Sequence, residues 1–361
     1  MGRFLLRQVI SLYVLIISAI SCLAFPAAGS CSPEEAVTRK EWRELDNLQR
    51  REYIDAIRCL RKRPSVLPNE EFPGVRDRLD DFIATHINYT NTIHNNGLLL
   101  PWHRHFLTLW GKTLRQECGY KGGLPYWNWA LDAGLLSLSQ SPVFDGSGSS
   151  LSGNGLYDPA ERPICNTEGE CLPRGTGGGC VYSGPFENFT VHMGPFNSSL
   201  AQPYSPLPPN AFAYNPHCLT RSLNPPLLAS MNNQTLVDQM QSAETITEFL
   251  AVMEPSDENS LGSHGGGHHG VGGTMVDLFT SPQDPVFILH HGMIDRMWTQ
   301  WQNQDVVNRR YALNGTTVIY DPPGAPPVTL DTVVEFGPLD IPRKVREIMD
   351  PLDRKYCYRY T

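Results

Sequence analysis

Hydrophobic residues recur at helical spacing in several long segments of this chain. Tyr53, Ile57 and Leu60 lie three or four positions apart, and with the apolar residues before them they predict a helix over residues 33–61. The prolines at positions 64 and 68 end that helix. The same pattern, together with start and stop signals, predicts further helices over residues 75–87, 101–118, 234–253 and 286–302. The fold class is therefore mainly α.

Between these helices the pattern changes. Residues 139–216 are rich in Gly, Pro, Ser and Asn and contain three cysteines, which indicates long loops tied by disulfides rather than a flexible linker. Residues 316–320 have the composition of a short strand. No convincing internal repeat is present. We expect a few short strands beside a helical core, in one domain.

The N-terminal segment resembles a secretion signal. Arg3 and Arg7 precede an uncharged apolar run from residue 9 to residue 25, and the small residues 27–30 follow it. This pattern predicts a signal peptide over residues 1–28 and a mature domain over residues 29–361. The alternative is a single membrane anchor, but the run is at the short end for a span and no basic cluster follows it directly. We expect no stable membrane association after cleavage.

Composition narrows the class further. Hydrophobic residues make up 40% and charged residues 18%, which is typical of a globular protein. The net charge of −8 and the lack of a basic run argue against a nucleic-acid partner. Apart from Cys22 in the signal, eight cysteines remain, and with five Asn-x-Ser/Thr sequons they favour a secreted, disulfide-bonded glycoprotein. Zinc ligation is the alternative for the cysteines, but no CxxC pair occurs, and the sequence does not fix the pairing.

Two groups of histidines carry the candidate chemistry. Six of the eleven histidines form two sets of three along the chain, which are His86, His94, His103, His264, His268 and His291. Three imidazoles can hold a metal ion and leave a position open for a substrate or a gas, so two sets suggest a binuclear centre. All-imidazole sites suit copper or zinc. The absence of a bridging carboxylate favours a redox pair that handles dioxygen.

The surroundings of the two sets differ. His264 and His268 are four residues apart, but the glycines between and around them oppose a helix by about 1 kcal/mol each. A flexible surface His/Gly tract is therefore an alternative there. His103 lies at the start of an apolar helix, and His291 and Asp295 are spaced to share a helix face, where the carboxylate can orient the helix or a ligand.

Two sequence strings resemble a known family. Leu-Pro-Trp-His-Arg-His-Phe at residues 100–106 and Asp-Pro-Val-Phe-Ile-Leu-His-His-Gly-Met-Ile-Asp-Arg-Met-Trp at residues 284–298 are similar to motifs of fungal tyrosinases and catechol oxidases, the type-3 copper polyphenol oxidases. The resemblance runs from about residue 39 to residue 361. It implies a four-helix bundle that holds two copper ions. His105, His269 and His290 are then neighbours of the site. The implied copper ligands are His86, His94 and His103 for one ion and His264, His268 and His291 for the other.

The resemblance also implies an activity. Such enzymes oxidise o-diphenols and related phenols to o-quinones with dioxygen, and tyrosinases also hydroxylate monophenols. Phe287 corresponds to a phenylalanine at the base of the family's site, with a packing and gating role. Glu254 could match a family acid that holds a water near the second copper. The alternative for Glu254 is a solvated glutamate at a helix end.

Three local features refine these expectations. Thr92 stands where many members have a cysteine that forms a thioether, so we expect no thioether. Gly265 follows the first ligand of the second site, where efficient tyrosinases often have asparagine, which favours diphenol oxidation with weak monophenol hydroxylation. Tyr358 and Tyr360 resemble the motif that closes the family's catalytic core, with Arg39 packed against it. Because the chain ends there, we expect no C-terminal shielding domain and no proteolytic activation.

Two other functions remain as alternatives. A dioxygen-binding protein of the haemocyanin type would have the same ligands but a blocked access path. A structural or zinc-binding relative would have lost activity, although all six ligand positions are filled here. The expected small-molecule partners are dioxygen and small phenols or catechols.

Overall fold

The computed structural model describes residues 31–165, 169, 171–196, 200–255 and 261–361. The predicted signal peptide over residues 1–28 lies outside them. The helices are α1 Asn47–Leu60, α2 Arg78–Ile93, α3 Leu99–Cys118, α4 Pro225–Met231, α5 Gln234–Ser242, α6 Ile246–Met253, α7 Gly262–Val271, α8 Val286–Gln304 and α9 Val306–Arg309. The strands are β1 Val37–Arg39, β2 Gly155–Tyr157, β3 Gly178–Val181, β4 Thr190–Val191, β5 His217–Cys218, β6 Val333–Val334, β7 Arg343–Lys344 and β8 Tyr358–Tyr360. The predicted mainly α fold with a few short strands is confirmed.

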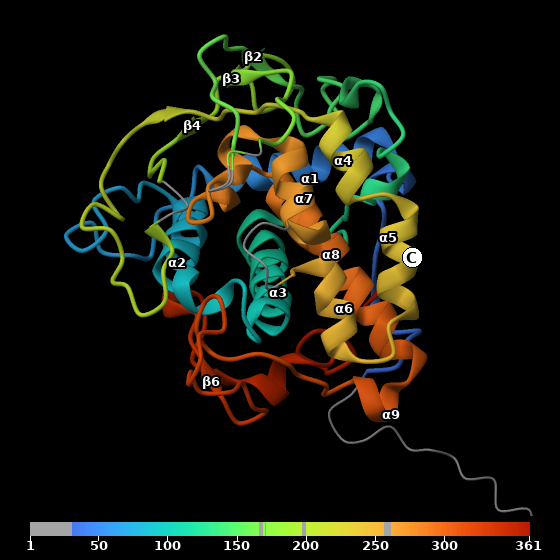
Figure 1. Cartoon of the computed structure of the whole chain (residues 1–361). Helices are drawn as coiled ribbons and strands as arrows, with labels where there is room; N and C mark the ends of the chain where they lie inside the picture. The colour runs from blue at the N-terminus through green and yellow to red at the C-terminus, as the bar shows by residue number, and fades with distance from the viewer. Residues whose placement is uncertain (1–30, 166–168, 170, 197–199, 256–260) are drawn as a thin grey trace, which may run out of the picture.

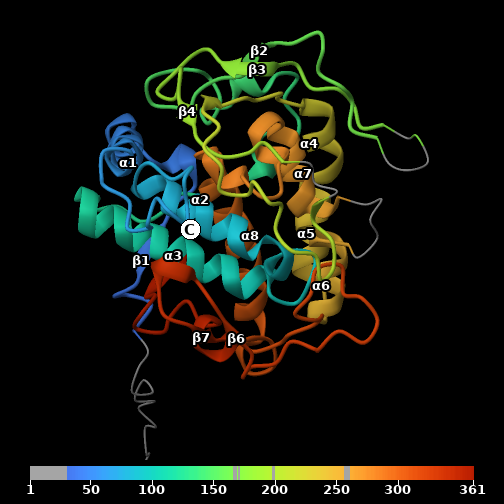
Figure 2. The ribbon, with the colours of Figure 1, turned by 90° about the vertical axis from the view of Figure 1, so that its left-hand side faces the viewer.

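Four helices form the centre of the molecule. Helix α3 packs against α2 and α8, and α8 packs against α7 (Figure 1). Helix α1 covers α3, while α4 and α6 pack on α7 and α5 packs on α8 (Figure 2). The long loops with β2 and β3 lie at one end, and the C-terminal segment with β6 lies at the other. The predicted four-helix bundle is therefore present, surrounded by shorter helices and loops.

The first predicted helix is shorter than expected. The Asp46 side chain accepts hydrogen bonds from the backbone N–H groups of Leu48 and Gln49, so it starts α1 at Asn47. The preceding residues instead form β1, which pairs in parallel with β8, and a 3-10 helix at Trp42–Glu44. The spacing of apolar residues before residue 46 therefore comes from an extended segment that is partly buried, and not from a helix.

Three other boundaries also differ from the predictions. The helix predicted over residues 234–253 is broken between α5 and α6, because Thr245 caps a new helix together with Glu248. Helix α2 continues to Ile93, so that His86 lies inside it and not near its end. The strand predicted over residues 316–320 is absent, and this segment makes only an isolated bridge from Thr316 to Pro327.

Four disulfides join all eight cysteines of the described chain. Cys31–Cys357 links the two ends beside the β1–β8 pair, and Cys59–Cys118 links α1 to the end of α3. The other two, within the long loop region, are Cys165–Cys171 and Cys180–Cys218. The disulfide prediction is confirmed, and the loop region is tied as expected. Among the described residues, no helix is long and apolar enough to cross a membrane.

A buried ionic cluster ties the chain ends to the bundle. The Asp295 carboxylate on α8 accepts hydrogen bonds from Arg104 Nε at 2.6 Å, Tyr358 at 2.5 Å, Tyr360 at 2.6 Å and Arg39 at 3.2 Å. The Arg39 guanidinium also lies 3.4 Å from the Tyr358 ring centroid, which confirms the predicted packing of Arg39 on the tyrosine motif. Asp295 therefore joins β1, α3, α8 and β8.

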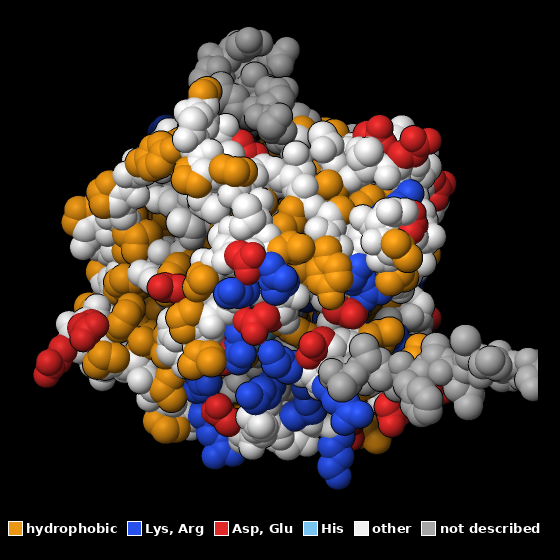
Figure 3. Space-filling view, turned by 90° about the horizontal axis from the view of Figure 1, so that it is seen from below, with side chains coloured by type: hydrophobic (Ala, Val, Ile, Leu, Met, Phe, Trp, Pro, Cys, Tyr) orange, Lys and Arg blue, Asp and Glu red, His pale blue; other side chains and the backbone are white. Residues whose placement is uncertain are grey.

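The surface at the C-terminal end has mixed charge. Lys and Arg side chains gather on this face among Asp and Glu (Figure 3). On the C-terminal segment, Asp331 pairs with Lys344 at 3.1 Å and with Arg346 at 2.7 Å. Cations there are interleaved with acids, which is typical of a solvated surface.

Candidate metal centre

The first histidine set is built from α2 and α3. His86 lies inside α2, His94 is its C-terminal cap, and His103 lies near the start of α3. Nδ1 of His86 meets the carbonyl oxygen of Phe279 at 2.9 Å, and His94 and His103 each meet the carbonyl four residues earlier, at 3.0 and 2.8 Å. A carbonyl only accepts, so Nδ1 carries the proton and Nε2 keeps its lone pair.

These Nε2 atoms have the character of metal ligands. Nε2 of His86 and of His103 is buried and has no hydrogen-bond partner in the described structure. The ring centroids of the three histidines are 4.9, 5.2 and 5.7 Å apart. Burial lowers the pKa of His86 to about 4 and holds the pKa values of His94 and His103 well below the usual value, so all three are neutral. Neutral imidazoles with convergent lone pairs fit a metal ion.

The second set comes from α7 and α8. Nε2 of His268 lies 3.2 Å from Nε2 of His264 and 3.2 Å from Nε2 of His291. Nδ1 of His268 meets the Met275 carbonyl oxygen at 2.8 Å, and Nδ1 of His264 meets the Glu254 carboxylate at 3.1 Å. Both partners are acceptors, so the Nε2 lone pairs of His264 and His268 face each other. A cation between them removes that repulsion, so this set also fits a metal ion.

Helix α7 forms despite its glycines, because close packing requires them. A Cβ at Gly267 would lie 2.2 Å from Cε1 of His290 on α8, and one at Gly266 would lie 2.4 Å from Cβ of Met231 on α4. Only glycine allows α7 to approach both helices this closely. The alternative interpretation, a flexible surface His/Gly tract, is therefore wrong, because His264 and His268 lie on one buried face of a helix.

His290 lies close to the second set but does not offer a lone pair to it. Its ligand atom falls within 4.8 Å of those of the other three histidines. However, the Trp129 indole donates a hydrogen bond to Nδ1 of His290 at 3.0 Å. An indole N–H only donates, so the proton of the neutral imidazole is on Nε2. This geometry supports His290 as a neighbour and His291 as the ligand. Trp129 lies in none of the motifs quoted above, and no pattern in the sequence indicates its role.

Phe287 joins the two histidine sets. Its ring centroid lies 4.2 Å from that of His291, 5.3 Å from His86 and 5.9 Å from His268, and the residue is fully buried. The rings of His103 and His291 stack across the two sets at 4.3 Å. The two sets therefore form one centre with an apolar floor. Complete burial fits the packing role expected for Phe287.

Glu254 is not the solvated glutamate of the alternative interpretation. It caps the C-terminus of α6, and its side chain is only 8% exposed while it contacts His264. The carboxylate also lines a cavity of about 230 Å³ beside Asn95 and Asn96. A carboxylate that accepts from Nδ1 fixes the orientation of a ligating imidazole and raises its basicity.

Two further histidines, His105 and His192, bond to groups outside this centre. His105 bonds through Nδ1 to the Tyr356 hydroxyl at 2.6 Å and through Nε2 to Asp340 at 2.8 Å. His192 pairs with Asp80 at 2.6 Å in a third cluster that includes Asp77. The Arg61 guanidinium already contacts both carboxylates, at 2.9 and 3.5 Å, so this cluster is an ion-pair junction.

Comparison with known proteins agrees with the geometry. Residues 76–304 match the family model of the common central domain of tyrosinase. N-acetyl-6-hydroxytryptophan oxidase ivoB of Emericella nidulans is 46% identical over 359 residues, with 95% of this chain and 97% of the relative covered. Tyrosinase P of Aspergillus terreus is 47% identical over 358 residues, with 96% and 98% covered.

A solved structure supports the same conclusion. A variant of the polyphenol oxidase from Thermothelomyces thermophila superposes with a TM-score of 0.84 at 34% identity, covering 92% of this chain and 91% of that chain. The two buried imidazole sets fit the binuclear copper site of such oxidases. The chain therefore belongs to the tyrosinase family and is a copper-dependent oxidoreductase of the polyphenol oxidase type.

Proposed function

We propose that this protein oxidises o-diphenols to o-quinones with dioxygen, with weak hydroxylation of monophenols. The observation that carries the proposal is the convergence of two buried histidine sets from α2, α3, α7 and α8 on one centre, in which the Nε2 atoms of His86 and His103 have no hydrogen-bond partner among the described residues. In this proposal one copper is held by His86, His94 and His103, and the other by His264, His268 and His291. The copper pair supplies redox chemistry in which two diphenols lose two electrons and two protons each, and one dioxygen becomes two waters.

Residues around the ligands prepare the centre for this reaction. Glu254 holds the His264 ring in place and is a buried proton acceptor at the edge of a cavity. Phe287 excludes water from the floor. Gly265, which follows His264 in the chain, has no side chain that could hold a water to take a phenol proton. A diphenol loses a hydroxyl proton more readily than a monophenol does. It therefore depends less on a protein group that takes the proton, which supports the diphenol preference.

The relatives support a phenolic substrate class. One is named for oxidation of N-acetyl-6-hydroxytryptophan and another is named a tyrosinase. We further propose that residues 1–28 are a signal peptide and that the protein is secreted. Four disulfides support an oxidising environment.

Copper content and oxygen uptake test the proposal together. The purified protein should contain two coppers per chain, consume oxygen with 4-tert-butylcatechol and consume little with tyrosine. Fast tyrosine hydroxylation would overturn the role given to Gly265. Two coppers without turnover of either substrate would instead indicate a haemocyanin-like dioxygen-binding protein, and absence of copper would overturn the ligand assignment.

A further inference from the structure

His94 is the one proposed ligand that lies outside a helix. The other five lie within α2, α3, α7 and α8, whereas His94 follows the last residue of α2 and has an extended backbone, with φ −127° and ψ 151°. Its ring bonds to the Thr90 carbonyl oxygen, but this bond does not hold the backbone that leaves the helix. The His94 turn, residues 94–97, therefore needs support from another part of the chain.

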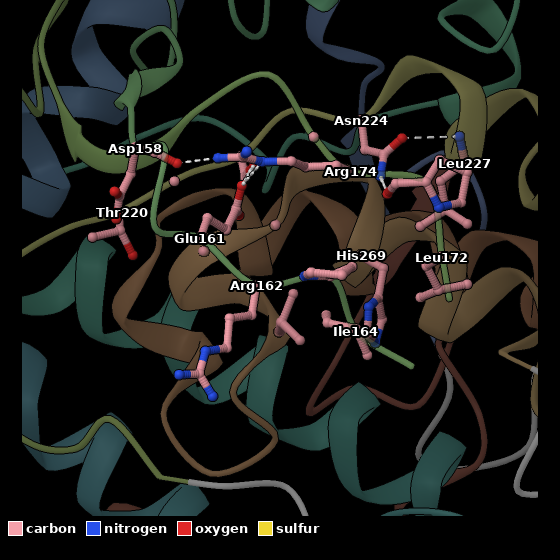
Figure 4. A pocket seen from close by; sticks show the side chains of 18 residues that line it. Asp158, Glu161, Arg162, Ile164, Leu172, Arg174, Thr220, Asn224, Leu227 and His269 are labelled. Atoms are coloured by element: carbon pink, nitrogen blue, oxygen red, sulfur yellow. Dashed lines mark hydrogen bonds and ion pairs between the residues drawn. The ribbon is translucent and has the colours of Figure 1, made fainter. Parts of the chain in front are cut away.

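The ligands on α7 are placed differently. Figure 4 shows a cavity of about 360 Å³ beside α7, with His269 in its lining, and none of the six proposed ligands is among the described residues that line it. Helix α7 packs on α4 and α8, so helix packing, and not a loop, places His264 and His268. The position of His269 in this lining supports it as a neighbour of the centre and not a ligand.

A second turn, residues 316–321, is bonded to the His94 turn through the backbone. The Tyr320 N–H donates to the Asn95 carbonyl oxygen at 2.8 Å, and the Gly97 N–H donates to the Thr316 carbonyl oxygen at 3.0 Å. One bond runs in each direction between the two turns. Together they fix the path of the chain directly after His94.

The two turns also fit closely. A Cβ at Gly97 would lie 2.4 Å from Cγ1 of Val328 and 2.7 Å from the Asn314 carbonyl oxygen. Asn95 and Tyr320 have φ angles of 46° and 65°. Positive φ angles in residues other than glycine persist only where surrounding contacts hold them. Each turn thus keeps the other in an uncommon conformation.

Asp321 closes the second turn. Its Oδ1 accepts a hydrogen bond from the Thr316 N–H at 2.5 Å, and its own N–H donates to the Val318 carbonyl oxygen at 3.2 Å. Thr316 is therefore held at its N–H by Asp321 while its carbonyl oxygen holds Gly97. The φ angle of Asp321 is 45°, which aspartate and asparagine tolerate better than most residues.

We propose that Asp321 is a positioning residue for the copper ligand His94. Its carboxylate closes the 316–321 turn, this turn holds the His94 turn, and the His94 turn keeps the imidazole in the first histidine set. The inference rests on the proposed function, and it adds a residue that none of the sequence motifs contains.

Removal of the carboxylate acceptor tests this role. Glycine tolerates the positive φ angle, so Asp321→Gly deletes the acceptor without a steric conflict, whereas Asp321→Asn keeps an acceptor oxygen. In chelator competition on the copper-loaded protein, Asp321→Gly should hold one of its two coppers about tenfold more weakly than wild type. The other copper should keep its affinity, and Asp321→Asn should retain both. A merely structural role would weaken both coppers together.

Gly97→Ala tests the same contact from the side of the His94 turn. Its new Cβ would clash with Val328 and Asn314, so it should cause the same loss at one copper. Gly134→Ala is the matched control, because a Cβ there meets no atom within 4 Å, and it should retain both affinities. Thermal unfolding of the copper-free proteins shows whether each variant folds.

The outcomes separate this inference from the proposed function. Wild-type affinity for both coppers in Asp321→Gly and Gly97→Ala would overturn the positioning role, and so would equal weakening of both coppers. The same loss in Asp321→Asn as in Asp321→Gly would also overturn it. A wild-type protein that binds no copper would contradict the ligand assignment of the proposed function, and this inference with it.

Discussion

Trp129 donates its indole N–H to Nδ1 of His290 across 3.0 Å. This contact lies beside the second histidine set, where the His290 ring is parallel to that of His264 at a centroid distance of 5.6 Å. The indole places the imidazole proton on Nε2, so neither nitrogen of His290 offers a free lone pair to a metal ion. A histidine close enough to compete with His291 is thus kept from ligation by a hydrogen bond from outside the bundle.

Replacing Trp129 by Phe should release this constraint. Without the indole donor, His290 can carry its proton on Nδ1 and present the Nε2 lone pair to the metal. We expect copper binding near two per chain, an altered Cu(II) electron paramagnetic resonance spectrum and roughly tenfold lower catechol turnover. Trp127→Phe is the matched control, since this buried indole bonds to Asp132 at 2.7 Å and, among the described residues, makes no hydrogen bond or ring contact with a histidine. A spectrum identical to wild type in Trp129→Phe would contradict the tautomer argument.

Gly267→Ala should disturb His290 by a steric clash, because Gly267 on α7 packs directly against the His290 ring. In an ordinary helix this change would stabilise by about 1 kcal/mol. Here the new Cβ would lie 2.2 Å from His290, so either the ring or α7 must move. We expect a loss of about 1–3 kcal/mol in urea unfolding, as for overpacked cores, together with weaker copper binding. The control Gly265→Ala meets only the Leu261 side chain, at 3.1 Å, and should not destabilise.

The sequence predicts the parts of this site that obey local rules. Helix α8 has a regular apolar pattern after Pro285, and its predicted and observed ends differ by two residues. Helix α7 was not predictable from propensity, because its glycines are explained only by the approach of Met231 and His290. The role of Trp129 likewise depends on a contact across 161 residues of sequence. Tertiary contacts decide these features, and periodicity carries no information about them.

Asp295→Asn should be among the most destabilising single changes. The substitution removes the only negative charge of the cluster and leaves Arg39 and Arg104 buried. Breaking a buried ion pair from one side costs about 3–5 kcal/mol. Urea unfolding should show a loss of this size, while Asp331→Asn, at an exposed pair, should cost less than about 1 kcal/mol. Equal effects of the two changes would refute the structural role of the cluster.

Glu254 can be tested by separating its charge from its hydrogen bond. In Glu254→Gln the amide oxygen still accepts from Nδ1 of His264, so we expect two coppers per chain and about tenfold lower turnover. Glu254→Ala also removes the acceptor and should weaken copper binding about 10–100-fold. Competition with a chelator measures this affinity, and Glu52→Gln on the exposed face of α1 is the control. Full copper affinity in Glu254→Ala would show that His264 does not need this partner.

The copper-free protein should lose stability as the pH falls from about 6.5 to 4. Burial lowers the pKa values of His86, His105 and His269 to about 4. Between pH 6.5 and 4 the unfolded chain therefore binds more protons at these histidines than the folded chain, so the free energy of unfolding rises with pH. Asp77 acts in the opposite direction, because burial and the nearby Asp80 raise its pKa to about 6. Burial raises the pKa values of Glu41 and Asp277 as well, but it lowers those of eight histidines, so the histidines outweigh the three carboxyl groups.

His105→Gln isolates one of these contributions. His105 is buried against Tyr356 and Asp340 outside the histidine sets, so the change removes one titrating group without removing a proposed ligand. Its pKa shift corresponds to a slope of at most about 1.4 kcal/mol per pH unit between pH 6.5 and 4. Urea unfolding of the copper-free variant across this range should show a slope reduced by up to that amount. Identical slopes for His105→Gln and wild type would show that His105 does not stay neutral on folding.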